Sequence, residues 1–124
     1  MTTFKKVKVY FLLIFVFVNI VYIAPCYSLP LREDLFKNAL ELSSGGKFNK
    51  ALQEWNSYLD SYPDDAAGLS NRGNVRLVLG DLEGSIDDQN DAISLNPSEI
   101  DPYINRGIAE EALGLWSQAE KDYM

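Results

Sequence analysis

The chain has 124 residues, room for one small domain, and carries a formal net charge of −7. It contains no histidine and a single cysteine, which excludes an intrachain disulfide, triads built on histidine, and metal sites built from imidazole or thiolate groups. Beyond residue 28, 8 Lys and Arg stand against 18 Asp and Glu, and no basic patch offers a surface for nucleic acid.

Residues 1–28 have the pattern of a secretory signal peptide or a membrane anchor. A basic stretch at residues 4–8 is followed by a run from Val9 to Ala24 that is apolar at every position but one. Cleavage after Ser28 would leave small residues beside the cut, and we favour it. The alternative is an uncleaved anchor, because the apolar run reaches about 18 residues when it is counted from Val7, and this is the lower limit for spanning a bilayer.

The orientation of this segment follows from its lysines. Lys5, Lys6 and Lys8 hold the N-terminus in the cytoplasm, so we expect the rest of the chain on the opposite side of the membrane. A third interpretation makes Cys26 a lipid-carrying residue. It is disfavoured because such a site needs a small residue directly before the cysteine, and Pro25 occupies that position here.

After residue 31 the sequence repeats with a period of 34 residues. The rows are 32–65, 66–99 and the incomplete 100–124, and they align without gaps. A small residue recurs where one helix must approach its partner, a glycine recurs between the two halves of each row, and a proline closes the first two rows. These columns are Ala39, Gly73 and Gly107; Gly46, Gly80 and Gly114; and Pro63 with Pro97.

Apolar residues recur at helical spacing inside each half of a row, and no run alternates with period two. The sequence therefore predicts an all-α fold built from antiparallel helix pairs. The predicted helices are 31–44, 48–61, 66–79, 82–95, 100–113 and 115 onward.

These columns resemble the tetratricopeptide repeat (TPR) family across residues 32–124. The second row matches best, from Ala66 to Asn74 and from Leu79 to Ile86. The Asn-Arg-Gly run at 71–73, repeated at 105–107, is similar to cyanobacterial and plastid members of the family. The resemblance implies a right-handed α-solenoid whose concave side, lined by the first helix of each pair, binds peptides or partner helices.

The resemblance also implies a non-catalytic scaffold or adaptor for another protein, with no cofactor and no metal. With the N-terminal segment, it points to the periplasm or the thylakoid membrane or lumen, and to assembly of a membrane or photosynthetic complex. Membrane contact is expected only through that segment. The alternative is the N-terminal binding module of a larger enzyme, because the sequence stops at Met124 inside a predicted helix.

The groove-facing positions of the family correspond here to a mixture of apolar and polar side chains: Phe36, Leu40, Ser70, Asn71, Asn74, Leu77, Asp101, Ile104, Asn105 and Ile108. Asparagine amides both donate to and accept from a peptide backbone, so we expect them to hold an extended segment. The alternative is that Leu40, Leu77 and Ile108 only pack helices together. Members that grip the acidic C-terminus of chaperones use cationic groove residues. Asp101 has the wrong charge for binding such an acidic C-terminus. We therefore expect partners with basic or neutral polar segments.

Arginine stands at two positions where the family usually has leucine, Arg72 and Arg106. An aspartate follows each of them sixteen residues later, at Asp88 and Asp122. This spacing predicts an arginine–carboxylate bond inside both repeats. The alternative is two pairs of solvated charges, each worth less than about 1 kcal/mol.

Two further columns carry unusual residues. Arg76 and Glu110 are 34 residues apart, which favours either a pair between stacked helices or exposure at the groove edge. Gln89 stands where Trp55 and Tyr123 fill the core, which predicts looser packing in the second repeat.

Adjacent carboxylates are interpreted as solvated surface, because neighbours on a helix diverge by about 100° and acid–base catalysis needs a carboxyl in an apolar pocket. These pairs are Asp64 with Asp65, Asp87 with Asp88, and Glu110 with Glu111.

Overall fold

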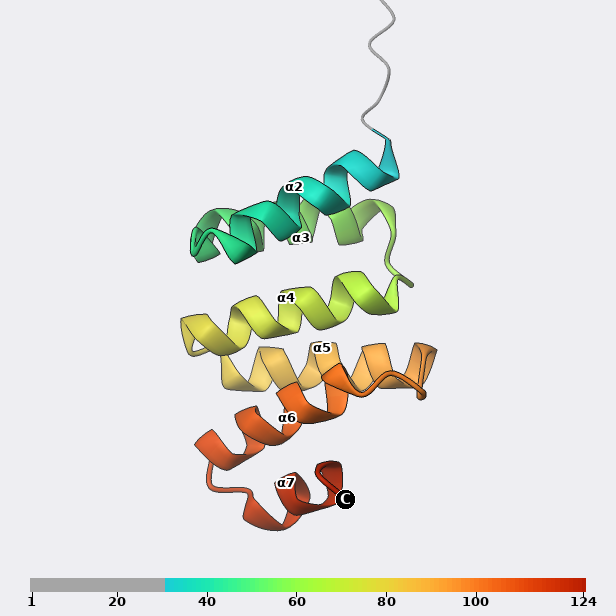
Figure 1. The fold of residues 1–124 in the computed structure, drawn as a ribbon. Helices are drawn as coiled ribbons and strands as arrows, with labels where there is room; N and C mark the ends of the chain where they lie inside the picture. Colours follow the sequence, from blue (N-terminus) through green and yellow to red (C-terminus); the bar gives the residue numbers. More distant parts are fainter. Residues whose placement is uncertain (1–30) are drawn as a thin grey trace, which may run out of the picture.

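The computed structural model describes residues 31–124, where six α-helices follow one another without a strand (Figure 1). They are α2 (Arg32–Ser44), α3 (Phe48–Ser61), α4 (Ala66–Leu79), α5 (Leu82–Leu95), α6 (Asp101–Ala112) and α7 (Trp116–Asp122). Each lies within two residues of its predicted range, so the all-α prediction is confirmed for this part of the chain. The predicted signal peptide or anchor lies outside the described residues.

The helices form three antiparallel pairs stacked along one direction (Figure 1). Each helix packs against the next, and α4 also contacts both α2 and α6, the first helices of the neighbouring pairs. The three first helices therefore line one continuous side of the stack. Among the helices of residues 31–124, none combines the length and the apolar character that a bilayer span requires.

The tight turn between the helices of each pair needs a left-handed backbone. The three glycines of the predicted column have positive φ angles of 71°, 85° and 77°, at Gly46, Gly80 and Gly114. An L-residue with a Cβ rarely adopts this conformation, which is why glycine recurs there every 34 residues. The predicted turn column is confirmed.

The small-residue column brings the two helices of each pair into close contact. Ala39 is fully buried in the first pair. A Cβ at Gly73 would lie 2.6 Å from the Nε2 atom of Gln89, and a Cβ at Gly107 would lie 2.5 Å from the ring of Tyr123. These positions must stay small for the helices to approach as they do.

The apolar core is concentrated in the first pair and its contact with α4. Trp55 and Tyr58 are almost completely buried, and the Phe36 ring meets both edge-on, with centroid separations of 5.0 and 5.5 Å. Edge-to-face pairs of this kind add to the stabilisation from burial alone. Their burial packs α2 on α3 at the start of the stack.

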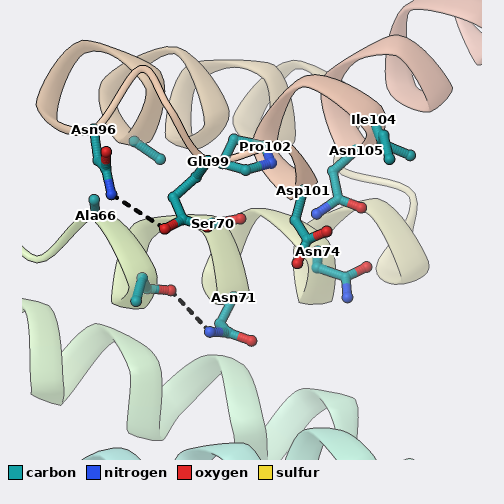
Figure 2. Close-up of a pocket in the computed structure, with 12 residues that line it drawn as sticks. Ala66, Ser70, Asn71, Asn74, Asn96, Glu99, Asp101, Pro102, Ile104 and Asn105 are labelled. Atoms are coloured by element: carbon teal, nitrogen blue, oxygen red, sulfur yellow. Dashed lines mark hydrogen bonds between the residues drawn. The ribbon is translucent and has the colours of Figure 1, made fainter. Parts of the chain in front are cut away.

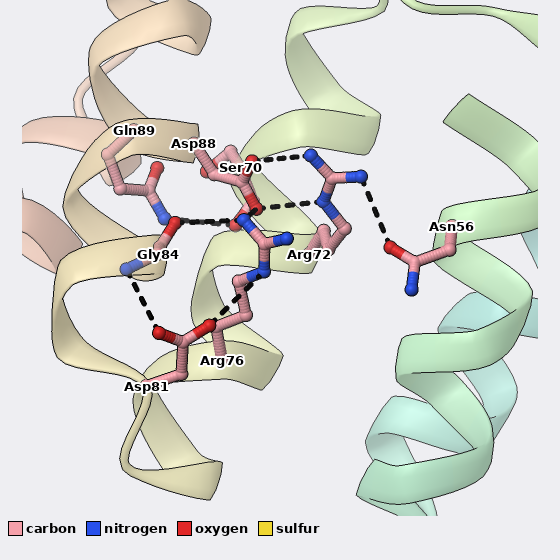
Figure 3. A network of polar contacts seen from close by, with 8 residues as sticks. All are labelled: Asn56, Ser70, Arg72, Arg76, Asp81, Gly84, Asp88 and Gln89. Carbon is pink, nitrogen blue, oxygen red and sulfur yellow. Dashed lines mark hydrogen bonds and ion pairs between the residues drawn. The ribbon is translucent and has the colours of Figure 1, made fainter. Parts of the chain in front are cut away.

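The second pair does not pack loosely at Gln89, so that prediction is wrong. The Gln89 side chain is fully buried, and its Nε2 donates a hydrogen bond of 3.0 Å to the backbone carbonyl of Ser70 (Figure 3). Its Oε1 has no partner among the described residues. The buried amide therefore links α5 to α4.

Candidate peptide-binding groove

A hollow of about 380 Å³ lies between α4 and α6 on the side of the stack formed by the first helices (Figure 2). The loop between α5 and α6 closes one end of it. Its lining residues are Ala66, Ala67, Ser70, Asn71, Asn74, Ala92, Asn96, Glu99, Asp101, Pro102, Ile104 and Asn105. In the close-up, the Asp101, Asn105 and Asn74 side chains turn toward one another from the two helices.

A smaller hollow of about 170 Å³ lies on the other side of α4, next to α2 and the start of α3. Its lining is more apolar and consists of Leu40, Ser43, Ser44, Phe48, Asn71, Asn74, Val75 and Val78. Asn71 and Asn74 line both hollows. We call the two hollows and the asparagines between them the groove.

The structure brings most of the sequence-predicted groove residues together. The larger hollow contains Ser70, Asn71, Asn74, Asp101, Ile104 and Asn105, and the smaller one contains Leu40. Phe36 instead packs into the aromatic cluster with Trp55 and Tyr58. Leu77 is half-buried and Ile108 is exposed, and neither lines either hollow. Because Leu40 and Ile108 are 40% and 43% exposed, helix packing alone does not account for them.

Sequence reasoning missed the groove residues that come from outside the first helices. Asn96 and Glu99 lie in the loop before α6, and Asn96 donates to the Glu99 carboxylate over 3.3 Å. Phe48 belongs to the start of α3. The recurring proline at Pro97 marks this loop in the sequence, but the period alone does not show that the loop folds over the concave side.

The asparagine side chains retain free hydrogen-bonding capacity. Asn71 donates from Nδ2 to the Ala67 carbonyl over 2.8 Å, which leaves its Oδ1 available (Figure 2). Within residues 31–124, no side-chain hydrogen bond holds Asn74 or Asn105. An amide with a free donor and a free acceptor can bind both the C=O and the N–H of an extended peptide.

The charge of the groove is negative. Glu99 and Asp101 place carboxylates in the larger hollow, and no Lys or Arg lines either hollow. Asp101 takes part in none of the ion pairs formed within residues 31–124. A cationic group entering the larger hollow would therefore meet an unpaired carboxylate.

Behind the groove, the predicted arginine–aspartate bonds are confirmed in both repeats. Arg72 donates from Nε and Nη2 to Asp88 over 2.9 and 2.6 Å (Figure 3). Arg106 does the same to Asp122 over 2.7 and 2.5 Å. The Asp88 bond raises the pKa of Arg72 above its ordinary value, against the effect of burial. The Asp88 and Asp122 side chains are only 3% and 7% exposed, so these are not solvated surface pairs.

Each of these arginines also reaches back to the preceding repeat. Arg72 donates from Nη1 to the Oδ1 of Asn56 over 3.2 Å, and Arg106 donates to that of Asn90 over 2.7 Å. Figure 3 shows Asn56 facing Arg72 from α3. One side chain per repeat thus links three helices and fixes the position of α4 and α6, which carry the groove.

Arg76 and Glu110 neither pair with each other nor lie exposed at the groove edge. Arg76 contacts Asp88 at 3.0 Å and donates to the Gly84 carbonyl over 3.1 Å (Figure 3). Glu110 is 8% exposed, and its Oε2 has no partner among the described residues. Burial raises the pKa of Glu110, and the nearby Asp122 carboxylate raises it further.

The interpretation of the adjacent carboxylates as solvated surface is wrong for Asp88 and Glu110, because both are buried. Their neighbours Asp87 and Glu111 are exposed, as expected for residues that diverge around a helix. Asp65 caps α4 by accepting from the Gly68 N–H over 3.0 Å. Burial opposes ionisation there, but hydrogen bonds from Tyr58 and Arg32 hold the pKa of Asp65 below its ordinary value.

Comparison with known proteins identifies this architecture. No protein-family model matches the chain. A FAM10 family protein of Arabidopsis thaliana is 33% identical over 84 residues, covering 68% of this chain and 19% of the relative. Tetratricopeptide repeat protein 36 of Danio rerio is 27% identical over 95 residues, covering 73% of this chain and 51% of the relative. The chain therefore spans about a fifth to a half of the length of these two curated relatives.

A solved structure agrees with the same fold. The first TPR domain of Spaghetti (RPAP3), bound to the HSP90 peptide SRMEEVD, superposes with a TM-score of 0.71 at 27% identity, covering 74% of this chain and 73% of that one. Residues 31–124 thus form a helical-repeat stack with a concave groove. The chain has the tetratricopeptide repeat fold.

Proposed function

We propose that this chain is a protein-interaction scaffold whose groove holds an extended segment of a partner protein. The observation that carries the proposal is the set of asparagine amides in the groove, of which Asn74 and Asn105 are free to bond a peptide backbone. Asn71 and Asn74 line both hollows, so one backbone crossing α4 would reach both. The role is binding, without a catalytic step.

The comparison with the HSP90-peptide complex supports peptide binding. The charges in the groove of this chain, however, favour a peptide of different sequence. The peptide SRMEEVD ends in four residues of which three carry a carboxylate. In this chain the larger hollow contains Glu99 and Asp101 and no cation, so an acidic segment would be repelled. Basic or neutral polar segments are the partners that this groove accepts.

The test is affinity purification of the full chain from its native cell extract, with identification of the proteins that co-elute. Asn71→Ala combined with Asn74→Ala should abolish the partner's recovery, because it removes the two amides shared by both hollows. Asn49→Ala, at an exposed position of α3 outside the groove, is the matched control and should retain the partner. Recovery of the same partner by the double variant would show that it binds elsewhere.

We further propose that the scaffold is exported or membrane-tethered by residues 1–28, in the periplasm or the thylakoid membrane or lumen, and aids assembly of a membrane or photosynthetic complex. The support is the basic start, the apolar run and the likeness of the Asn-Arg-Gly runs to cyanobacterial and plastid TPR proteins. Fusion of alkaline phosphatase after residue 31 should yield active enzyme in the bacterial periplasm. Replacing the three N-terminal lysines by glutamate should lower that activity. A fusion protein that stays inactive in the cytoplasm would contradict export.

A further inference from the structure

We propose that the groove selects an extended peptide that carries one apolar and one cationic side chain a few residues apart. The inference rests on the proposed function and assigns a side-chain chemistry to each of the two hollows. The smaller hollow takes the apolar side chain, the larger one takes the lysine or arginine, and the asparagines between them bind the backbone.

The smaller hollow offers an apolar surface that the fold leaves uncovered. Its walls include Leu40, Phe48, Val75 and Val78, of which Leu40 and Val78 are 40% and 53% exposed. Covering such side chains with an aliphatic group removes apolar area from water, which is favourable in proportion to that area. No carboxylate or cation lines this hollow, so a charged side chain would lose hydration there without a partner.

The larger hollow suits the long side chain of a basic residue. Ala66, Pro102 and Ile104 provide apolar walls along which a methylene stem can lie, as the stems of lysine and arginine commonly do. Asp101 and Glu99 place carboxylates at the same cavity, where they can accept charge-assisted hydrogen bonds from a cationic head. At about 380 Å³ the cavity has room for such a side chain.

The spacing of the two side chains follows from the packing of the helices. The hollows flank α4, which contacts both α2 and α6, and they meet at Asn71 and Asn74. Packed helices lie about 8–10 Å apart, and an extended chain advances about 3.3 Å per residue. The apolar and cationic residues of the partner should therefore be about two to four positions apart.

Isothermal titration calorimetry tests this with the full 124-residue chain, kept in a mild detergent because of its apolar N-terminal run. The probes are capped octapeptides of serine and glycine with leucine at the third position and arginine at the sixth. Comparison peptides carry glutamate or serine in place of the arginine, or serine in place of the leucine. We expect the leucine–arginine peptide to bind at least tenfold more tightly than the leucine–glutamate peptide in 50 mM salt, with a smaller ratio in 300 mM salt.

Two variants assign the preference to the two hollows. Asp101→Asn should reduce the preference for arginine over serine at least fivefold while leaving the serine peptide's affinity unchanged, and Leu40→Ser should remove the preference for leucine. The controls carry the same changes outside the groove, as Asp87→Asn and Leu95→Ser, and should bind like the unaltered chain. Both control positions are exposed on α5.

The outcomes separate this inference from the proposed function. If the glutamate peptide binds as tightly as the arginine peptide, and Asn71→Ala with Asn74→Ala weakens both, the groove binds peptides but the charge selection is wrong. If the asparagine substitutions leave the affinity of every peptide unchanged, the groove is not the binding site. In that case the proposed function fails together with the inference.

Discussion

The second and third repeats share the same helix pair, the same turn glycine and the same arginine–aspartate bond, yet they differ in one column. In the second repeat Arg76 contacts Asp88, so that one carboxylate is held by two arginines. In the third repeat the equivalent residue is Glu110, buried near Asp122, and its Oε2 has no partner within residues 31–124. The backbone pattern of a repeat therefore does not fix how its interior charges are compensated.

This difference assigns distinct roles to the two helices that form the larger hollow. Among the ion pairs of residues 31–124, Asp88 ties α4 to α5 through both Arg72 and Arg76, whereas Asp122 ties α7 to α6 through Arg106. The Asn56 and Asn90 contacts then connect each arginine to the previous repeat. We infer that α4 is the rigid wall of the groove and that α6 is held more weakly.

The largest expected effect is therefore at Asp88. Asp88→Asn should destabilise the fold by about 3 kcal/mol, because it leaves two partly buried arginines without their anionic partner. Asp122→Asn should cost about 1–2 kcal/mol, since one arginine is affected and α7 is more exposed. Urea unfolding followed by circular dichroism measures both. Equal losses at the two positions would remove the asymmetry between the repeats.

Reversing the charge at Glu110 should make the third repeat resemble the second. Glu110→Arg places a cation beside Asp122, as Arg76 stands beside Asp88, and we expect a gain of about 1–2 kcal/mol in the free energy of unfolding. Glu111→Arg makes the same change of charge at the exposed neighbour and should stay within about 0.5 kcal/mol of the unaltered chain. A loss of stability in Glu110→Arg would show that the column's environment is not equivalent in the two repeats.

The pH dependence of Glu110 provides a separate test. Its pKa is raised in the folded state, so folding disfavours the ionised carboxylate. The resulting destabilisation is absent below the ordinary pKa of 4.5, grows as the pH rises above that value, and is complete above the raised pKa. Glu110→Gln should therefore be more stable than the unaltered chain at pH 7, and this advantage should disappear near pH 4. A constant difference across that range would contradict burial of an ionised group.

The smallest expected effect concerns the links between repeats. Asn56→Ala and Asn90→Ala each remove one exposed hydrogen bond from an arginine and should cost about 0.5–1 kcal/mol. The control is Asn49→Ala, at an exposed position of α3 where no arginine is contacted within residues 31–124. Thermal unfolding distinguishes them, and a cost at Asn56 no greater than at Asn49 would show that Arg72 does not couple the repeats.

The sequence predicted those features that depend on backbone geometry. The 34-residue period located all six helices of the described part, because turns such as that at Gly80 require glycine and close contacts such as that at Gly73 require a small residue. The sixteen-residue spacing between arginine and aspartate also predicted the bond in both repeats, since this spacing places the two side chains opposite each other on paired helices.

The features that the sequence did not predict depend on which side chains meet across helices. Arg76 contacts the buried Asp88 within its own repeat and does not pair with Glu110 in the next one. Phe36 joined the aromatic cluster because Trp55 and Tyr58 stand opposite it. A period describes equivalent positions, but it does not describe the partners that become available when those positions carry different residues.

Nuclear magnetic resonance of the asparagine side-chain amides shows whether a peptide occupies the groove. The signals of Asn71, Asn74 and Asn105 can be assigned by single substitutions in the full chain and followed while the leucine–arginine octapeptide is added. We expect these amide signals to shift together and saturate, while those of Asn49 and Asn38, at exposed positions of α3 and α2, stay in place. Shifts confined to residues outside the groove, with Asn71 and Asn74 unmoved, would contradict it.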